Sequence, residues 1–383
     1  MAFLTALRSA FPQFAQRAKD GHGYAQQDAE EAWSQIVSQL RQKLKLKDST
    51  TPAEQAADMS FIDKYMAGKF ESVMECDDPA AKEAGEEPVK SGDTFFKLNC
   101  HINAETNHLR DGLAAGLKEQ IEKRSPVLER DAMYTKTSRI SRLPKYLPVH
   151  FMRFDWRRTT NKKAKIMRKV TFPQELDVVD FCTDDLKKML IPIRDKIRDV
   201  RKEEEDVERA RKRQKRMRDG EENDVERERE LKATGPASEK ELAQQKSANK
   251  KNSAGAGGDA EMADVAYKTD AEVEVERAAS ILKGKKELLA LVDPKLGADD
   301  GANQTGLYEL RGVITHQGAS ADSGHYTSFV KKDGRKDPVT GKRKEEDGKW
   351  WWFNDDKVTE VDQERIETLS GGGKSPFGRS SLT

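Results

Sequence analysis

The sequence predicts an α+β fold in which a long charged segment separates two parts of one folded domain. Three patterns lead to this prediction. Apolar residues recur at helical spacing over residues 1–45. Short aromatic and β-branched runs, which are typical of strands, follow over 61–172 and return over 305–361. Between them, residues 194–270 are mostly charged or small and polar, and such a segment cannot form a core.

Composition limits the function classes open to the chain. Of its 383 residues, 36% are charged and 35% hydrophobic, whereas an ordinary globular domain has about 25% charged residues. The formal net charge is only +1, which argues against a protein built mainly to coat nucleic acid. Since no run reaches about 18 apolar residues, we expect no membrane span. Three scattered cysteines, Cys76, Cys100 and Cys182, cannot form a disulfide framework and predict a reducing, cytoplasmic environment.

The first third of the chain is predicted to begin with helices and to continue with short strands. Two helices separated by a glycine-containing turn are expected within residues 1–45. Strands are expected at 70–74 and 95–102, with a loop rich in glycine, proline and glutamate between them at 77–92. A short helix is expected over 113–121.

The clearest strand of the first half covers residues 146–154. Both of its faces are largely apolar, a pattern that favours a central position in a sheet. Pro148 argues against this position for the first residues, because proline removes a hydrogen-bond donor from the ladder. A basic loop is expected to follow through Lys165, and a further strand at 166–172.

The charge excess is concentrated in the middle of the chain. Over residues 194–230, 28 of 37 residues are charged, 14 of each sign, which predicts a solvated or loosely coiled helix. Residues 233–270 have the composition of a disordered linker, and a short helix near 278–291 ends the insertion. We therefore divide the chain into one discontinuous domain, its insertion and an unstructured tail: 1–192 with 301–373, then 193–300, and 374–383.

The last ordered region is predicted to be rich in strands. Four are expected, the first two joined by a loop rich in glycine and serine: 307–315, 325–330, 349–353 and 357–361. A short helix is expected at 363–370, because Asp362 can cap its first turn and Gly371 can end it.

The strongest chemical signal of this region surrounds His325. This residue stands at the start of a strand, directly after a flexible loop, and Gly324 permits a close backbone approach. Asn354 and Asp355 follow the next aromatic strand, and a hairpin return would bring one of them beside the imidazole. A histidine in this setting can take a proton from a nucleophile while the amide or carboxylate oxygen fixes its tautomer. Taken alone, a single histidine at a strand start is more often structural.

Several short motifs, read in chain order, carry a resemblance to a known enzyme family. They are Gln26-Gln27-Asp28-Ala29, Ser141-Arg142-Leu143-Pro144, Gly324-His325-Tyr326, and the aromatic run 350–353 followed by Asn354, Asp355 and Val358. Together they resemble the boxes of the ubiquitin-specific proteases, the papain-like cysteine deubiquitinases. The segments at 11–14, 314–318 and 369–373 further resemble the proteasome-associated branch of that family.

The resemblance covers residues 3–192 and 305–373, and it implies a papain-like fold with palm and fingers. The implied activity is thiol-dependent hydrolysis of isopeptide and peptide bonds at the C-terminal glycine of ubiquitin. His325 would be the general base and Asn354 its orienter, with Asp355 as a substitute. The resemblance also implies that two loops, 155–165 and 317–323, lie over the groove for the ubiquitin tail. The implied substrate-binding residues are Gln27, Asp28, His316, Gly324 and Tyr326.

Parts of the family pattern are not found in the sequence. The cysteine box is expected before residue 1, and none of Cys76, Cys100 and Cys182 has a comparable context, so none is assigned as the nucleophile. The ubiquitin-like domain that docks this branch on the proteasome, and a final palm strand after Gly373, are also missing. We therefore expect the chain as given to be an inactive fragment of a deubiquitinase.

The resemblance also defines the expected partners. These are ubiquitin and ubiquitinated proteins, with the proteasome regulatory particle a further partner through the missing ubiquitin-like domain. Single cysteines do not complete a zinc site, and we expect no metal, cofactor, nucleic acid or membrane. Two alternatives remain open: a catalytically dead module that binds ubiquitin, and an interaction protein that uses the charged helix. The basic run at 211–216 resembles a nuclear import signal, although a basic block in such a helix is more common.

Overall fold

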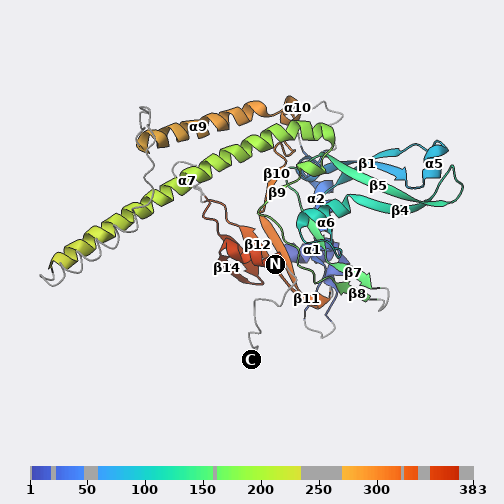
Figure 1. Ribbon diagram of the computed structural model, residues 1–383. Helices are drawn as coiled ribbons and strands as arrows, with labels where there is room; N and C mark the ends of the chain where they lie inside the picture. The colour runs from blue at the N-terminus through green and yellow to red at the C-terminus, as the bar shows by residue number, and fades with distance from the viewer. Residues whose placement is uncertain are drawn as a thin grey trace. The chain divides into compact units, whose positions relative to one another are not determined.

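A computed structural model gives the architecture of the chain (Figure 1). It describes residues 2–18, 23–46, 59–157, 162–233, 270–320, 323–334 and 346–370. The chain divides into two compact units, Met1–Ile191 with Asp293–Thr383 and the intervening Pro192–Val292. The first unit combines mainly antiparallel sheets with short helices, so the predicted α+β class is confirmed. The finer division of the chain that we made from the sequence stays a prediction.

The first large sheet is antiparallel, with the strand order β2-β1-β5-β4. Its strands are β1 Gly68–Cys76, β2 Val89–Phe95, β4 Lys118–Arg124 and β5 Asp131–Arg142. Figure 1 labels three of these strands, β1, β5 and β4. A small core beside this sheet joins Cys76 of β1 and Ala132 and Tyr134 of β5 with Ala81 of the helix α5 (Pro79–Glu83). The strand predicted at 70–74 is confirmed as the middle of β1.

Two predictions for this region are wrong. The loop expected at 77–92 contains the helix α5 (Pro79–Glu83) and the first residues of β2. The helix expected over 113–121 is α6 (Leu109–Gly116), which ends before β4 begins at Lys118. The sequence of β4 is almost entirely charged and polar, so it lacks the alternation that marks a strand. Its conformation comes from antiparallel pairing with β5, a tertiary contact that local propensity does not report.

The second large sheet carries the segment around His325. It is antiparallel and follows chain order: β11 Gly312–Ser320, β12 Ser323–Lys331, β13 Trp350–Asn354 and β14 Lys357–Val361. Phe329, Trp350 and Ile366 form its buried core. Ile366 belongs to the helix α11 (Gln363–Glu367), which continues into the 3-10 turn Thr368–Ser370. The helix begins after Asp362 as predicted, but the Asp362 side chain makes no capping hydrogen bond. Three of the four predicted strands are confirmed. The strand expected at 307–315 is divided, because Leu307–Glu309 form β10 of another sheet, and β11 begins at Gly312 and extends through part of the expected loop.

Three two-stranded sheets complete the first unit. They are β3 Leu98–His101 with β6 Val149–Met152 in parallel, β7 Phe154–Arg157 with β8 Lys162–Lys165, and β9 Glu175–Asp177 with β10 Leu307–Glu309. β3 confirms the core of the strand expected at 95–102.

Three predictions around these small sheets are wrong. The strand expected at 146–154 is not central, because within the described residues β6 pairs only with β3 and begins after Pro148. The basic loop expected up to Lys165 is the β7–β8 hairpin. Residues 166–172 form no strand and make only an isolated bridge at Thr171.

The N-terminal helices agree with the sequence. α1 covers Ala2–Ala10, a 3-10 turn covers Pro12–Ala15, and α2 covers Ala29–Lys43. A further short helix, α4, covers Phe61–Met66. Asp28 starts α2, because its carboxylate accepts a hydrogen bond from the Glu30 amide at 2.8 Å. The expected turn between the helices lies partly outside the described residues.

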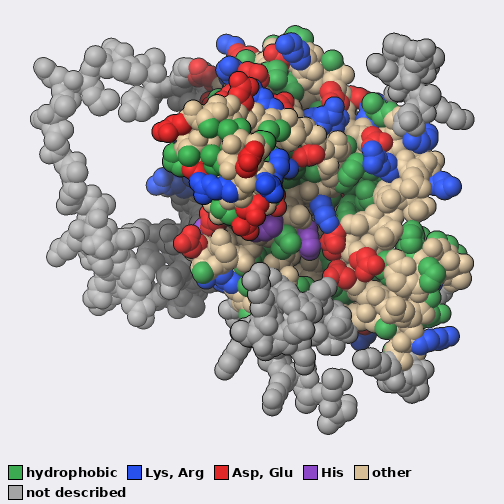
Figure 2. Space-filling model, turned by 90° about the vertical axis from the view of Figure 1, so that its right-hand side faces the viewer, with side chains coloured by type: hydrophobic (Ala, Val, Ile, Leu, Met, Phe, Trp, Pro, Cys, Tyr) green, Lys and Arg blue, Asp and Glu red, His purple; other side chains and the backbone are tan. Residues whose placement is uncertain are grey.

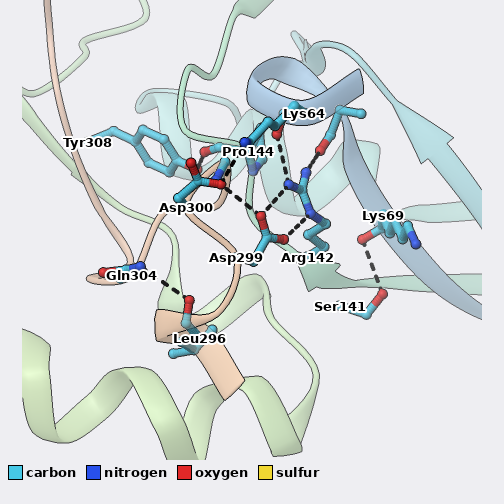
Figure 3. Close-up of polar contacts among 12 residues, drawn as sticks. Lys64, Lys69, Ser141, Arg142, Pro144, Leu296, Asp299, Asp300, Gln304 and Tyr308 are labelled. Carbon is cyan, nitrogen blue, oxygen red and sulfur yellow. Dashed lines mark hydrogen bonds and ion pairs between the residues drawn. The ribbon is translucent and has the colours of Figure 1, made fainter. Parts of the chain in front are cut away.

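A polar cluster joins the two stretches of the first unit (Figure 3). Arg142, the last residue of β5, donates to both carboxylate oxygens of Asp299, at 2.7 and 3.0 Å, and to two backbone carbonyls. Nearby, the Tyr308 hydroxyl donates to the Pro144 carbonyl. Asp299 follows the short helix α10 (Pro294–Gly297) and Tyr308 lies in β10. The segments before and after the insertion are therefore held by direct contacts.

The second unit is helical. α7 (Asp184–Ala233) begins in the first unit and continues into the second, where α9 (Asp270–Leu291) follows. Two ion pairs link the helices, Lys196 with Glu287 at 2.7 Å and Lys285 with Glu204 at 2.5 Å. The predicted charged helix and the helix near 278–291 are confirmed, and almost all of the predicted linker lies outside the described residues. Among the helices that the structure describes, none is both long and apolar enough to cross a membrane.

Candidate functional site

His325 and Asn354 lie on neighbouring strands of the second large sheet. His325 is the third residue of β12, and Asn354 is the last residue of β13, which pairs with β12 in antiparallel register. A two-residue turn, Asp355-Asp356, then leads into β14. Asp355 has a φ of 52°, a left-handed conformation that aspartate tolerates better than most residues.

The imidazole of His325 makes a short hydrogen bond with the side-chain amide of Asn354. The distance from His325 Nε2 to Asn354 Oδ1 is 2.5 Å. Since an amide oxygen can only accept, Nε2 carries the proton in this contact and Nδ1 remains the acceptor nitrogen of the neutral ring. Asp355 is farther away, with its Oδ2 atom 3.7 Å from Nε2. The structure thus brings the three predicted catalytic residues together, and Asn354 makes the closer contact.

The His325 side chain reaches the surface. It is 41% exposed, whereas Asp355 is 75% exposed. Figure 2 shows a face on which histidine side chains lie near the centre with Asp and Glu side chains close by. A proton acceptor that is fixed on one side and open to solvent on the other can act on a group brought to it from outside.

Gly324 fits tightly against the neighbouring strand. Its φ is 141°, a conformation that favours glycine. A Cβ atom at this position would lie 2.1 Å from the Gln317 carbonyl oxygen and 2.6 Å from His316 Nε2. The residue before His325 therefore has to be glycine for β11 and β12 to approach as they do.

Tyr326 connects the histidine strand with the start of α2. A backbone hydrogen bond joins its hydroxyl group to Ala29, and the carboxylate of Asp28 lies close enough to act on it electrostatically. Burial is the main cause that raises the pKa of Tyr326, and Asp28 raises it further. The predicted motif at 26–29 and the predicted histidine motif thus meet in space. Gln27 is partly buried next to Asp28.

His316 packs between aromatic side chains of two strand pairs. Its ring centroid is 4.7 Å from that of Tyr326 and 5.9 Å from that of Phe154 in β7. Lys165, at the end of β8, contacts the same histidine through its ammonium group. The sequence did not single out Lys165; the one available signal was the basic character of its segment.

The three cysteines have no place in this site. Each is a free, buried thiol. Burial raises the pKa of Cys100 to about 11 and that of Cys182 to about 12. A nucleophilic cysteine needs the opposite, a thiolate stabilised near neutral pH. Cys76 belongs to the core of the first large sheet. Among the residues that the structure describes, no three His, Cys, Asp or Glu side chains are arranged to hold a metal ion.

Comparison with known families identifies the chain. The family model described as "Ubiquitin carboxyl-terminal hydrolase" matches residues 1–377. The chain belongs to the ubiquitin carboxyl-terminal hydrolase family. The resemblance inferred from the sequence is therefore confirmed, and the family membership supports the papain-like, ubiquitin-specific protease fold for the first unit.

Individual members of the ubiquitin carboxyl-terminal hydrolase family match over nearly the whole chain. "Ubiquitin carboxyl-terminal hydrolase 6" of Schizosaccharomyces pombe is 40% identical over 98% of this chain and 64% of its own length. "Ubiquitin carboxyl-terminal hydrolase 6" of Arabidopsis thaliana is 34% identical over 97% and 61%. The chain thus spans about three fifths of the length of the curated relatives it matches. Among solved structures, a SAGA Ubp8 deubiquitinase module bound to ubiquitin aldehyde has a TM-score of 0.48 at 16% identity, covering 96% of this chain and 51% of that one.

Proposed function

We propose that this chain carries the histidine half of a cysteine-type deubiquitinase. In this proposal, His325 is the general base, Asn354 orients its ring, and Asp355 is the substitute orienter. The single observation that carries it is the 2.5 Å contact between His325 Nε2 and Asn354 Oδ1. This contact leaves Nδ1 to accept a proton from a thiol, as in a Cys-His-Asn arrangement.

The proposed reaction cleaves the bond after the C-terminal glycine of ubiquitin. The thiol gives its proton to His325 Nδ1 and its sulfur attacks the glycine carbonyl carbon. His325 then returns the proton to the leaving amine, and water hydrolyses the resulting thioester with His325 again as the base. The proposal assigns the thiol to none of Cys76, Cys100 and Cys182, since two have raised thiol pKa values and the third lies in a separate core.

The ubiquitin tail is proposed to pass along the surface where the histidine motif meets the start of α2. The residues proposed to contact it are Gln27, Asp28, His316, Gly324 and Tyr326. Support comes from the hydrogen bond between Tyr326 and Ala29, which joins the two motifs. We extend the proposal to ubiquitinated proteins as substrates, to the proteasome regulatory particle as a partner, and to the cytoplasm and nucleus as locations.

A fluorogenic ubiquitin substrate and a ubiquitin-binding measurement test this function together. They are applied to residues 1–383 and to any longer product of the gene. In a form that turns over, we expect His325→Ala to lower kcat by about 10²- to 10⁴-fold. Asn354→Ala should lower it by a smaller factor, since Asp355 remains nearby. Both variants should keep wild-type ubiquitin affinity.

His101→Ala is the matched control, since His101 lies at the end of β3 in a different sheet. It should leave kcat unchanged. Turnover by His325→Ala at the wild-type rate would disprove the general-base assignment. Tight ubiquitin binding without turnover in every product of the gene would favour the binding module over the enzyme.

A further inference from the structure

Lys165 makes an unusual set of contacts with the strand opposite His325. Its Nζ atom lies 2.8 Å from the His316 carbonyl oxygen, 3.0 Å from the Gly318 carbonyl oxygen and 3.2 Å from His316 Nδ1. An ammonium group has three N–H donors and no acceptor, so these three contacts can use all of them. All three acceptors belong to β11, whereas Lys165 is the last residue of β8.

These contacts surround one particular position of the β11–β12 ladder. Gln317, between the two carbonyls that Lys165 binds, is the cross-strand partner of His325, and His316 is the partner of Tyr326. Beyond Gln317 the register becomes irregular before Ser320. The rung that carries His325 is therefore the last regular one before the irregular end of the hairpin, where strands fray most easily.

The packing of Gly324 and the burial of Lys165 also indicate that the strands are held closely together at this rung. Gly324 lies so close to the Gln317 carbonyl that any side chain would separate the strands. Lys165 is partly buried, and burial together with the nearby charge of Arg153 lowers its pKa. Removing the ammonium group from water costs free energy, which strong contacts have to offset. Charge-assisted hydrogen bonds to the carbonyl oxygens are contacts of this kind.

We propose that Lys165 is a positioning residue for His325, which clamps segment 316–318 of β11 so that the opposing backbone holds the imidazole in reach of Asn354. This role rests on the proposed function of His325, but it concerns geometry and can be measured without turnover. It predicts that loss of the Lys165 ammonium group weakens the pairing of Gln317 with His325, while the rest of the sheet keeps its pairing.

The competing explanation is that Lys165 only adds general stability. Lys332 offers a matched control, because its ammonium group, one residue after β12, forms ion pairs with Asp347 at 2.8 Å and with Glu360 of β14 at 2.6 Å, away from the His325 rung. The variants are Lys165→Met and Lys332→Met. Both remove an ammonium group that contacts a strand of this sheet, and both keep a long unbranched side chain.

Two measurements on the folded chain compare these variants. The first is amide hydrogen exchange, read in peptides covering 312–331 and 350–361. The second is the ring tautomer of His325, read from the ¹⁵N spectrum of histidine-labelled protein. For Lys165→Met we expect at least about tenfold faster exchange in 312–331 and a mixed tautomer in place of the Nε2–H form. For Lys332→Met we expect the faster exchange in 350–361 and an unchanged His325 tautomer.

Unchanged exchange in 312–331 and an unchanged tautomer in Lys165→Met would overturn the proposal. Should this variant not fold, Lys165→Arg keeps the charge, but its planar guanidinium cannot direct one nitrogen at three acceptors. In this variant we expect a smaller increase in amide exchange over 312–331 and a smaller change of the His325 tautomer. Wild-type exchange together with the wild-type tautomer would overturn the proposal. If the His325 tautomer changes in Lys165→Met but His325→Ala keeps full turnover, the positioning role of Lys165 stands and the proposed function of His325 is rejected.

Discussion

At the scale of single residues, Arg142 shows how one side chain can hold together segments that are 157 positions apart in the chain. Its guanidinium forms a bidentate ion pair with the Asp299 carboxylate, which is a strong arrangement for arginine and a carboxylate. It also donates to two backbone carbonyls. Partial burial would by itself raise the pKa of Asp299, but the hydrogen bonds and charge of Arg142 outweigh it and the pKa lies below its usual value. The pair therefore stabilises the ionised carboxylate.

We expect Arg142→Met to lower the free energy of unfolding by about 2 kcal/mol at pH 7, since it leaves Asp299 and two carbonyls without their donor. The loss is smaller than for a fully buried pair, because Asp299 is 39% exposed. A lowered carboxyl pKa gives stability that is present above the unfolded value and is lost as pH falls. The difference from wild type should thus shrink below about pH 4.

Urea unfolding of both proteins between pH 3 and 7 measures this difference, with Arg139→Met as control. Arg139 lies on the same strand with an exposed side chain, and its replacement should change stability by less than about 0.5 kcal/mol. Equal losses for the two variants, or a difference that does not depend on pH, would contradict the role given to the Arg142–Asp299 pair.

At the scale of elements, the β11–β12 hairpin decides where His325 stands. Its close approach depends on Gly324, whose φ is 141°. Gly312, on β11 in the same hairpin, has no positive φ, and a Cβ there would meet only the Phe329 carbonyl at 3.6 Å. One sheet therefore contains a glycine that is needed and a glycine that can be replaced.

Gly324→Ala should destabilise the protein by roughly 2 kcal/mol or more, because the new methyl group meets the Gln317 carbonyl and the backbone conformation disfavours a side chain. Gly312→Ala should be neutral within about 0.5 kcal/mol. Thermal and urea unfolding of the two variants provide the comparison. Similar stabilities for both would show that the strands are not packed as closely as described.

The elements also explain which parts of the fold the sequence could predict. β12, β13 and β14 are consecutive strands rich in aromatic and β-branched residues, and each pairs with the next. The proximity of His325 and Asn354 therefore follows from antiparallel pairing of strands in chain order. β4 escaped prediction because its residues are charged and its strand form depends on β5. Lys165 escaped for a related reason: it contacts His316 across 151 positions, and no local spacing reports such a contact.

At the scale of the whole molecule, the first unit is one body made from two stretches of chain. The pairing of β9 with β10, the bridge between Pro144 and Ala302, and the Arg142–Asp299 pair all cross from one stretch to the other. Leu143 and Leu307, which lie in or beside these crossing segments, are buried. The two stretches thus share hydrogen bonds and packing that do not require a covalent link through residues 192–292.

We therefore expect residues 1–191 and 293–383, expressed as separate chains with different tags, to bind each other. Affinity purification through one tag should recover the other chain at equal stoichiometry. Arg142→Glu should weaken this recovery by at least about tenfold, because it places a like charge against Asp299. Arg139→Glu, on the exposed part of the strand, should leave recovery unchanged. No recovery of the wild-type pair would contradict the crossing contacts.

The tight turn after Asn354 sets a limit on how relatives of this chain can diverge. Only Asp355 and Asp356 separate β13 from β14. Because side chains alternate along a strand, one residue more or less at this turn would shift the strand pairing and reverse the faces of β14. The length of the insertion between Ile191 and Asp293 is not restricted in this way, because the free energy of closing a long surface loop rises only slowly with its length. In evolutionary terms, length variation should accumulate in the insertion, whereas the two-residue spacing beside Asn354 should stay fixed.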